Sequence, residues 1–162
     1  MRDQYFCTFA RYNAWANNRL YGACAELPSG EYLKPRQSFF GSIHATLNHL
    51  LVGDRIWLGR IEQRPVKLAL NQILYGDFVA LAVARTAEDE RLIRIVDGID
   101  STQLEETIDY VNSRGQRFRT PIRQVLAHLF NHQTHHRGQV HDMLSQTDVP
   151  PPELDLIFFL RQ

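Results

Sequence analysis

The amino-acid sequence predicts an all-α fold, an antiparallel four-helix bundle with one short β-hairpin before the last helix. Four long stretches place apolar residues at steps of three and four, which is the period of an amphipathic helix. A further segment, residues 106–119, alternates instead and contains a turn signal. Because 162 residues suffice for one hydrophobic core without disulfides, we expect a single domain over residues 1–162.

The four helices are expected at residues 3–26, 38–63, 77–97 and 121–146. The first ends at a Leu-Pro-Ser-Gly sequence, and the second stops before a proline. The fourth is expected to begin with Thr120 as its N-cap and a proline in its first turn. Three consecutive prolines lie beyond its end.

Two shorter segments complete the expected fold. Residues 106–111 alternate and are partly β-branched, residues 112–115 read Asn-Ser-Arg-Gly, and residues 116–119 return as a second strand. The apolar tail at residues 154–160 is expected to pack back on the bundle.

The composition excludes several classes of protein. Eighteen basic and eighteen acidic side chains cancel, so we expect no charged footprint for nucleic acid or an anionic membrane. No apolar run approaches the roughly 20 residues that span a bilayer. The first residues have a helical pattern with many polar side chains and do not resemble a secretory signal. The two cysteines, Cys7 and Cys24, fit neither a disulfide framework nor a zinc motif. We therefore expect a cytoplasmic protein.

The fourth helix carries an unusual pair of histidines. Its apolar stripe, continued at steps of three and four, reaches His132 and His136. Four residues turn a helix by about 400°, so both imidazoles point the same way, one turn apart. Burying unpaired imidazoles is costly, whereas a metal ion binds their neutral form. The pair therefore predicts a metal site. The stripe itself consists of Ile122, Val125, Leu126, Leu129, Val140, Met143 and Leu144.

The alternative interpretation is a pair of core histidines, each hydrogen-bonded to a neighbour. A zinc-protease motif does not fit, because it needs a glutamate directly after the first histidine and this chain has Gln133. His128, His135 and His141 lie off the centre of the stripe, so we interpret them as surface histidines or as groups that support the metal ligands.

A third ligand must come from another helix, because two nitrogens leave a metal ion under-coordinated. The second helix offers His44, His49 and Asp54. Asp54 lies nearest the centre of the apolar stripe and His49 towards its side, so periodicity does not decide among them.

Three segments resemble the DinB family. Residues 12–17 resemble its opening helix, and residues 47–51 with Asp54 and Trp57 resemble its second helix. Residues 131–139 resemble its most recognisable motif, in which His-Arg-Gly-Gln is the specific part. The resemblance covers essentially the whole chain in order and includes residues 153–156 of the tail.

The resemblance implies a four-helix bundle with a long crossover, assembled as a homodimer, and a divalent metal ion bound by His49, His132 and His136. Better-understood members of the family resemble thiol-dependent transferases, in which the metal activates a low-molecular-weight thiol such as bacillithiol, mycothiol or glutathione. The implied partners are therefore a small-molecule substrate and an external thiol. His44 is expected to be a surface residue that points away from the metal.

Other side chains are candidates for supporting roles. Asn48 and Gln139 are expected to hydrogen-bond the ligand imidazoles, and Asp54 to hold a water molecule or a bond near the metal. Asn13, with Asn17 one turn later, is expected to line the metal cleft.

Three more residues of the last helix are expected to have structural roles. Arg123 and Arg137 fit a solvated helix face, with anion binding as the alternative. Gly138 is expected to mark a close approach between helices, since a glycine inside a helix otherwise costs about 1 kcal/mol.

Three neutral imidazoles can bind several divalent ions, and we expect Zn²⁺ or Ni²⁺ before Fe²⁺ or Mn²⁺. With three protein ligands, the metal ion keeps coordination positions open for water, substrate or thiolate. These properties fit a metal-dependent transferase that uses an external thiol, because both cysteines lie at apolar positions and are expected to be inert. The alternatives are a metal-water hydrolase, a non-catalytic metal or small-ligand sensor, and a purely structural metal site.

Overall fold

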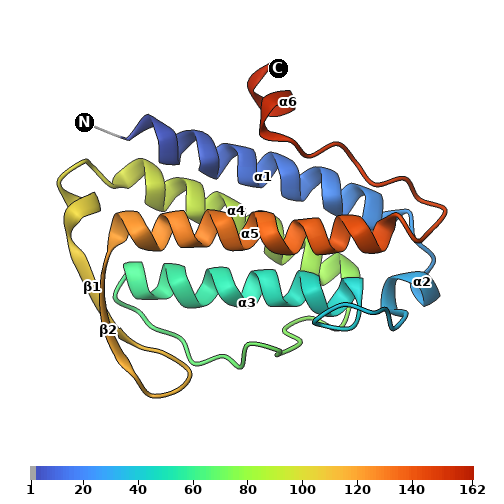
Figure 1. Cartoon of the computed structure of the whole chain (residues 1–162), viewed down its shortest axis with the longest axis horizontal. Coiled ribbons are helices and arrows are strands. Elements are labelled where there is room, and N and C mark those ends of the chain that lie inside the picture. Colours follow the sequence, from blue (N-terminus) through green and yellow to red (C-terminus); the bar gives the residue numbers. More distant parts are fainter. Residues whose placement is uncertain (1–2) are drawn as a thin grey trace.

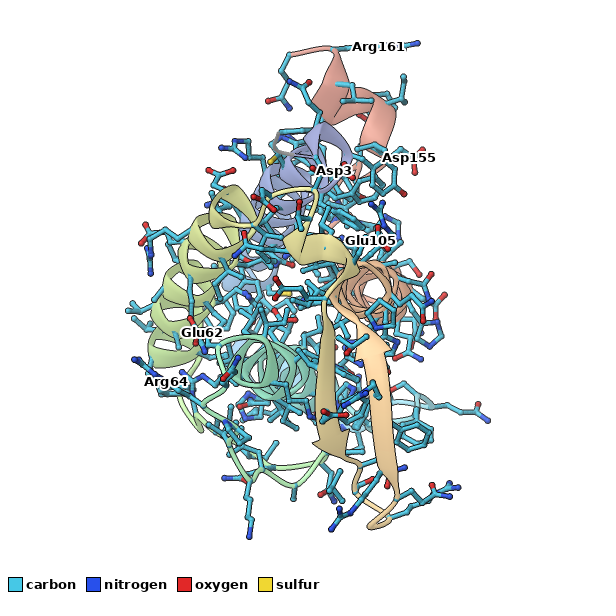
Figure 2. The ribbon with its side chains drawn as sticks, turned by 90° about the vertical axis from the view of Figure 1, so that its left-hand side faces the viewer. Asp3, Glu62, Arg64, Glu105, Asp155 and Arg161 are labelled. Carbon is cyan, nitrogen blue, oxygen red and sulfur yellow. The ribbon has the colours of Figure 1, made fainter. Side chains whose placement is uncertain are left out.

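The computed structural model describes residues 3–162 and has the predicted helical bundle. Helix α1 packs against α4 and α5, and α3 packs against the same two helices. Figure 2, which looks along the bundle, shows the four long helices around a shared interior. Their bounds are α1 (Gln4–Ala25), α3 (Ile43–Ile61), α4 (Phe78–Gly98) and α5 (Ile122–Leu144).

The direction of each helix follows from the connections. Helices α3 and α4 run in the same direction, and α1 and α5 run in the opposite one (Figure 1). Neighbouring helices that run in parallel need a connection that returns along the bundle. Residues 62–77 supply it as an extended segment beside α3, which is the long crossover that the resemblance implied.

Capping side chains determine where three of the helices begin. Asp3, Ser42 and Asp77 each accept a hydrogen bond, 2.8–3.1 Å long, from a backbone N–H two or three residues later. The second predicted helix therefore begins at Ile43 and not at residue 38. A short helix that the sequence pattern did not predict, α2 (Ser29–Leu33), lies between the first two long helices.

The hairpin is present and leads directly into α5. Strand β1 (Thr107–Val111) pairs antiparallel with β2 (Arg117–Pro121), after the 3-10 turn η1 (Gln103–Glu105). In the turn, Gly115 has a φ of +78°, a conformation that glycine adopts without strain.

The predicted cap of the last helix was wrong by one residue. Pro121 occupies the N-cap position that Thr120 was expected to hold. Thr120 lies in β2 instead, and the backbone N–H of Ile122 donates to the carbonyl of Glu106 at 2.9 Å. The end of the hairpin therefore anchors the first turn of the helix.

The tail packs on α1, as expected. It ends in the short helix α6 (Leu156–Leu160), where the Phe159 ring lies 6.0 Å from that of Tyr12 and 5.8 Å from that of Trp15. The Tyr12 hydroxyl donates to the carbonyl of Leu154 at 2.7 Å. Other apolar side chains of α6 stay exposed, namely Ile157, Phe158 and Leu160.

Buried polar side chains cross the middle of the bundle and divide its apolar core in two. On every long helix, apolar residues of one cluster precede them and residues of the other follow. Arg85 is 2% exposed and pairs with Asp54 at 2.7 Å and with Asp89 at 3.0 Å. We call this set the polar layer; it consists of Asn13, Asn17, Asp54, Arg85, Asp89, Gln133 and Arg137.

The Arg85→Met variant should lose about 3–5 kcal/mol of unfolding free energy, because it leaves two buried carboxylates without their shared cation. Arg94→Met is the matched control, since Arg94 is exposed and lies 3.9 Å from Glu90. It should lose about 0.5 kcal/mol or less. Urea unfolding followed by circular dichroism measures both, and equal midpoints would contradict the importance of the layer.

Candidate metal centre

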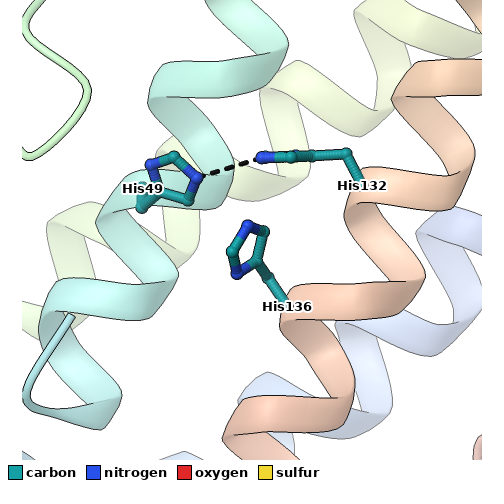
Figure 3. Close-up of side chains that lie close together, drawn as sticks. All are labelled: His49, His132 and His136. Atoms are coloured by element: carbon teal, nitrogen blue, oxygen red, sulfur yellow. Dashed lines mark hydrogen bonds between the residues drawn. The ribbon is translucent and has the colours of Figure 1, made fainter. Parts of the chain in front are cut away.

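Three histidines from two helices meet beside the polar layer. His49 lies on α3, and His132 and His136 lie one turn apart on α5. Each offers a nitrogen, and these nitrogens all lie within 4.8 Å of one another. Figure 3 shows the three rings converging between the helices, with 3.0 Å between the Nε2 atoms of His49 and His132. Of the three candidates on α3, only His49 joins this group.

Hydrogen bonds fix which nitrogen of two rings carries the proton. The Nδ1 atom of His49 lies 2.7 Å from the carbonyl oxygen of Leu70, and Nδ1 of His136 lies 2.7 Å from the amide oxygen of Gln139. Both oxygens can only accept, so each Nδ1 carries the hydrogen and each Nε2 keeps its lone pair. Such outer partners commonly orient histidines that bind metal.

Burial keeps the cluster uncharged. It lowers the pKa of His49 and of His136. It also lowers the pKa of His132 to about 3, and the neighbouring histidines add to this effect. All three rings are therefore neutral at pH 7, and neutral imidazole is the form that binds a metal ion. Three neutral nitrogens within reach of one point fit a divalent ion.

Known proteins resemble this chain in sequence and in fold. The DinB family model matches residues 1–162. The chain belongs to the DinB family. It is 28% identical over 156 residues to Protein DinB of Bacillus subtilis (strain 168), a match that covers 92% of this chain and 90% of that protein. A DinB-like protein from Bacillus subtilis, solved at 2.30 Å, has a TM-score of 0.61. That match has 14% identity and covers 88% of this chain and 95% of the other, which shows a shared fold.

No helix among residues 3–162 is long and apolar enough to cross a membrane.

Gly53 makes room for the His132 ring, a role that no sequence pattern predicted. A Cβ atom at Gly53 would lie 2.9 Å from Cε1 of His132. Gly53 follows His49 by one turn, so a side chain there would enter the space that the α5 imidazole fills. The prediction of a close helix approach at Gly138 was wrong, because a Cβ there would meet nothing within 4 Å.

Phe40 covers the histidines from the loop before α3. Its ring stacks on His49 with 3.9 Å between centroids and meets His136 edge-on at 5.5 Å. The loop has no periodic pattern, so no sequence signal pointed to this residue. The aromatic ring shields two of the imidazoles from water.

Asn48 does not bond a ligand imidazole, so that prediction was wrong. Its side-chain oxygen accepts from the backbone N–H groups of Leu74 and Tyr75, and its amide donates to the carbonyl of Tyr75. Asn48 therefore holds the crossover against α3. The partner of His49 is the Leu70 carbonyl of that same crossover.

Asn13 and Asn17 do not line the metal cleft as expected. Both donate to Asp89 in the polar layer, at 3.1 and 3.0 Å. Arg137, expected on a solvated face, is also buried there and donates to the side-chain oxygens of both asparagines. By contrast Arg123 is exposed, as predicted, and pairs with Glu105 at 2.7 Å.

Asp54 takes part in the polar layer through one of its two carboxylate oxygens. Its carboxylate pairs with Arg85 and accepts from the Gln133 amide at 2.5 Å. Among residues 3–162 the structure shows no hydrogen bond between Asp54 and the three histidines. Gln133 follows His132 directly, so this bond anchors α5 next to a ring of the cluster.

His44 is buried, which corrects its expected surface position. Its Nδ1 lies 2.9 Å from the hydroxyl of Tyr32. Tyr32 belongs to the short helix α2, which the hydrophobic pattern did not predict, so the pattern could not indicate this partner.

The remaining histidines lie outside the three-histidine group. The His128 ring lies 5.0 Å from that of Trp57, and His141 bonds the carbonyl of Pro152 at 3.1 Å. His135 is exposed and lies 3.3 Å from the amide of Gln139, the residue that orients His136.

The cysteines lie on α1. Cys24 is buried, and burial raises its pKa to about 12, so it is inert as predicted. Cys7 is partly exposed and lines a separate pocket beside Arg11 and Asp97.

Gly53→Ala should weaken zinc binding at least about tenfold, because the added methyl group displaces the His132 ring. Gly138→Ala is the matched control on the histidine helix, where the methyl group meets open space. It should bind zinc unchanged and gain about 1 kcal/mol of stability. Calorimetric titration of both variants decides, and equal affinities would show that the space at Gly53 is not needed.

Proposed function

We propose that His49, His132 and His136 bind one divalent metal ion and that the protein is a metal-dependent transferase of the DinB type. The proposed reaction joins a low-molecular-weight thiol to an electrophilic small molecule. One observation carries the proposal: three neutral histidine nitrogens form the candidate group within residues 3–162, with no fourth side chain among them. Structural zinc sites usually have four protein ligands, so three leave room for a reactant.

A bound divalent ion would supply Lewis acidity, which lowers the pKa of a thiol or a water molecule that it binds. The chain's own groups do the rest. Leu70 and Gln139 hold two imidazoles in the tautomer that presents Nε2. Phe40 excludes water from one side of the rings. In the overall reaction the thiol loses its proton to the solvent, its sulfur bonds to the electrophilic carbon, and the leaving group departs with the electrons of the broken bond.

The reacting thiol is proposed to come from outside the protein. Cys24 is buried, and its raised pKa disfavours the thiolate. Cys7 lines a pocket that does not include the histidines. A metal-water hydrolase has less support, because Asp54, its candidate general base, is buried in the polar layer, where it pairs with Arg85.

Each single replacement of a histidine in the group by alanine should remove most of the bound metal, because only two histidines would remain to hold the ion. The variants are His49→Ala, His132→Ala and His136→Ala. His44→Ala is the matched control on α3. It should keep the metal yet lose about 1–3 kcal/mol of unfolding free energy, because the Tyr32 hydroxyl loses its buried partner. Elemental analysis after dialysis against zinc, combined with urea unfolding, separates the two effects. Full metal occupancy in the ligand variants would reject the site.

The metal-loaded protein should consume electrophile faster than the metal-free protein when a thiol is supplied. A panel of glutathione, cysteine and bacillithiol with monobromobimane tests this by fluorescence. The Cys7→Ser/Cys24→Ala double variant should keep the activity, because neither cysteine supplies the nucleophile. A metal-loaded protein without turnover in any combination would favour the non-catalytic sensor.

A further inference from the structure

A pocket of about 660 Å³ lies beside the metal centre and extends away from it along α3. His49, Gly53, Ile56 and Arg60 line it at steps of four, three and four, which is one face of the helix. From the first to the last of these residues the helix rises about 16 Å. His132 lines the histidine end, and crossover residues 66–70 and hairpin residues 111–113 form further walls.

The charged lining of this pocket is entirely basic. Arg60 and Lys67 line it, and no aspartate or glutamate does among the described residues. Apolar side chains make up most of the remaining wall. They are Ile56, Trp57, Val66, Leu68, Ala69, Leu70 and Val111.

The Arg60 guanidinium is held in place without a counter-charge. It lies 4.4 Å from the centre of the Trp57 ring and 4.3 Å from that of Tyr110, and it donates to the Val111 carbonyl at 3.1 Å. Within residues 3–162 no carboxylate lies within ion-pair distance of it. Partial burial lowers the pKa of Arg60, which reflects water lost from a cation.

Two other half-buried arginines differ from Arg60 because they have carboxylate partners. Arg55 lies 3.6 Å from Glu88, and Arg91 pairs with Glu88 at 2.6 Å and with Glu62 at 2.5 Å. Their side chains are 28% and 26% exposed, and both have carboxylate partners. Arg60 instead contacts two aromatic rings and lines the pocket.

We propose that this pocket binds an elongated organic anion, with its apolar body along Ile56 and Trp57 and its anionic group on Arg60 and Lys67. The opposite end of the molecule then reaches His49 and His132. In that last respect the inference rests on the proposed function, since it makes the organic anion one of the two reactants. A planar guanidinium fixed in one orientation suits a carboxylate, sulfonate or phosphate group, which it binds through paired N–H donors.

Calorimetric titration with matched naphthalene probes tests the inference on the metal-loaded protein. The probes are 2-naphthoate, naphthalene-2-sulfonate, 2-naphthyl phosphate and the neutral 2-naphthamide. At least one anion should bind about tenfold or more tightly than the amide, and the order of the anions identifies the preferred group. If the neutral amide binds as tightly as every anion, the inference is wrong.

Variants locate the contact. Arg60→Met keeps the length and apolar character of the stem and should remove most of the anion preference while leaving amide binding within about twofold. Lys67→Met, on the exposed crossover, should reduce the preference without affecting folding. Arg94→Met, on the outside of α4, should change nothing. An undiminished preference in both pocket variants would overturn the proposal.

The metal and the anion are separable in the same assay. His136 is one of the three histidines but does not line the pocket. His136→Ala should therefore lose the metal and keep the anion preference that depends on Arg60. If its metal binding persists, the proposed metal site fails while the anion site stands. If the anion preference disappears together with the metal, the anion binds the metal and the Arg60 site is wrong.

Discussion

A layer of buried charged and amide side chains crosses the middle of the bundle, and all four long helices contribute to it. Such groups are costly to bury unless their partners meet them at the right height. Arg85 of α4 can satisfy Asp54 only when α3 and α4 lie in one register, and Gln133 ties α5 to the same carboxylate. We infer that the layer fixes the relative height of the helices. His132 therefore faces His49, so the geometry of the three-histidine group depends on the packing of the core.

The helical period predicted much of this structure, because it reports which side of a helix faces the core. It located the four long helices and the pair His132 and His136. It could not choose His49, because this residue lies at the side of the apolar stripe and the period marks only the centre of the stripe. The resemblance to the DinB family supplied that residue, and the structure brings it to the other two.

The wrong or absent predictions share a physical cause, because each of these residues contacts a side chain from another helix. The sequence pattern predicts that Arg137 is solvated, whereas in the structure it donates hydrogen bonds to two asparagines of α1. His44 reads as exposed because its partner Tyr32 lies in a five-residue helix, too short to show a period. Gly53 matters only because a ring from α5 occupies the space beside it. A pattern within one segment carries no information about such neighbours.

The crossover orients His49 with a backbone carbonyl and not with a side chain. Every amino acid has that carbonyl, so the hydrogen bond survives any replacement at residue 70 that keeps the path of the chain. Neighbouring crossover side chains line the pocket and are free to differ. Mutations in this segment can therefore change the walls of the pocket while the orientation of His49 stays the same.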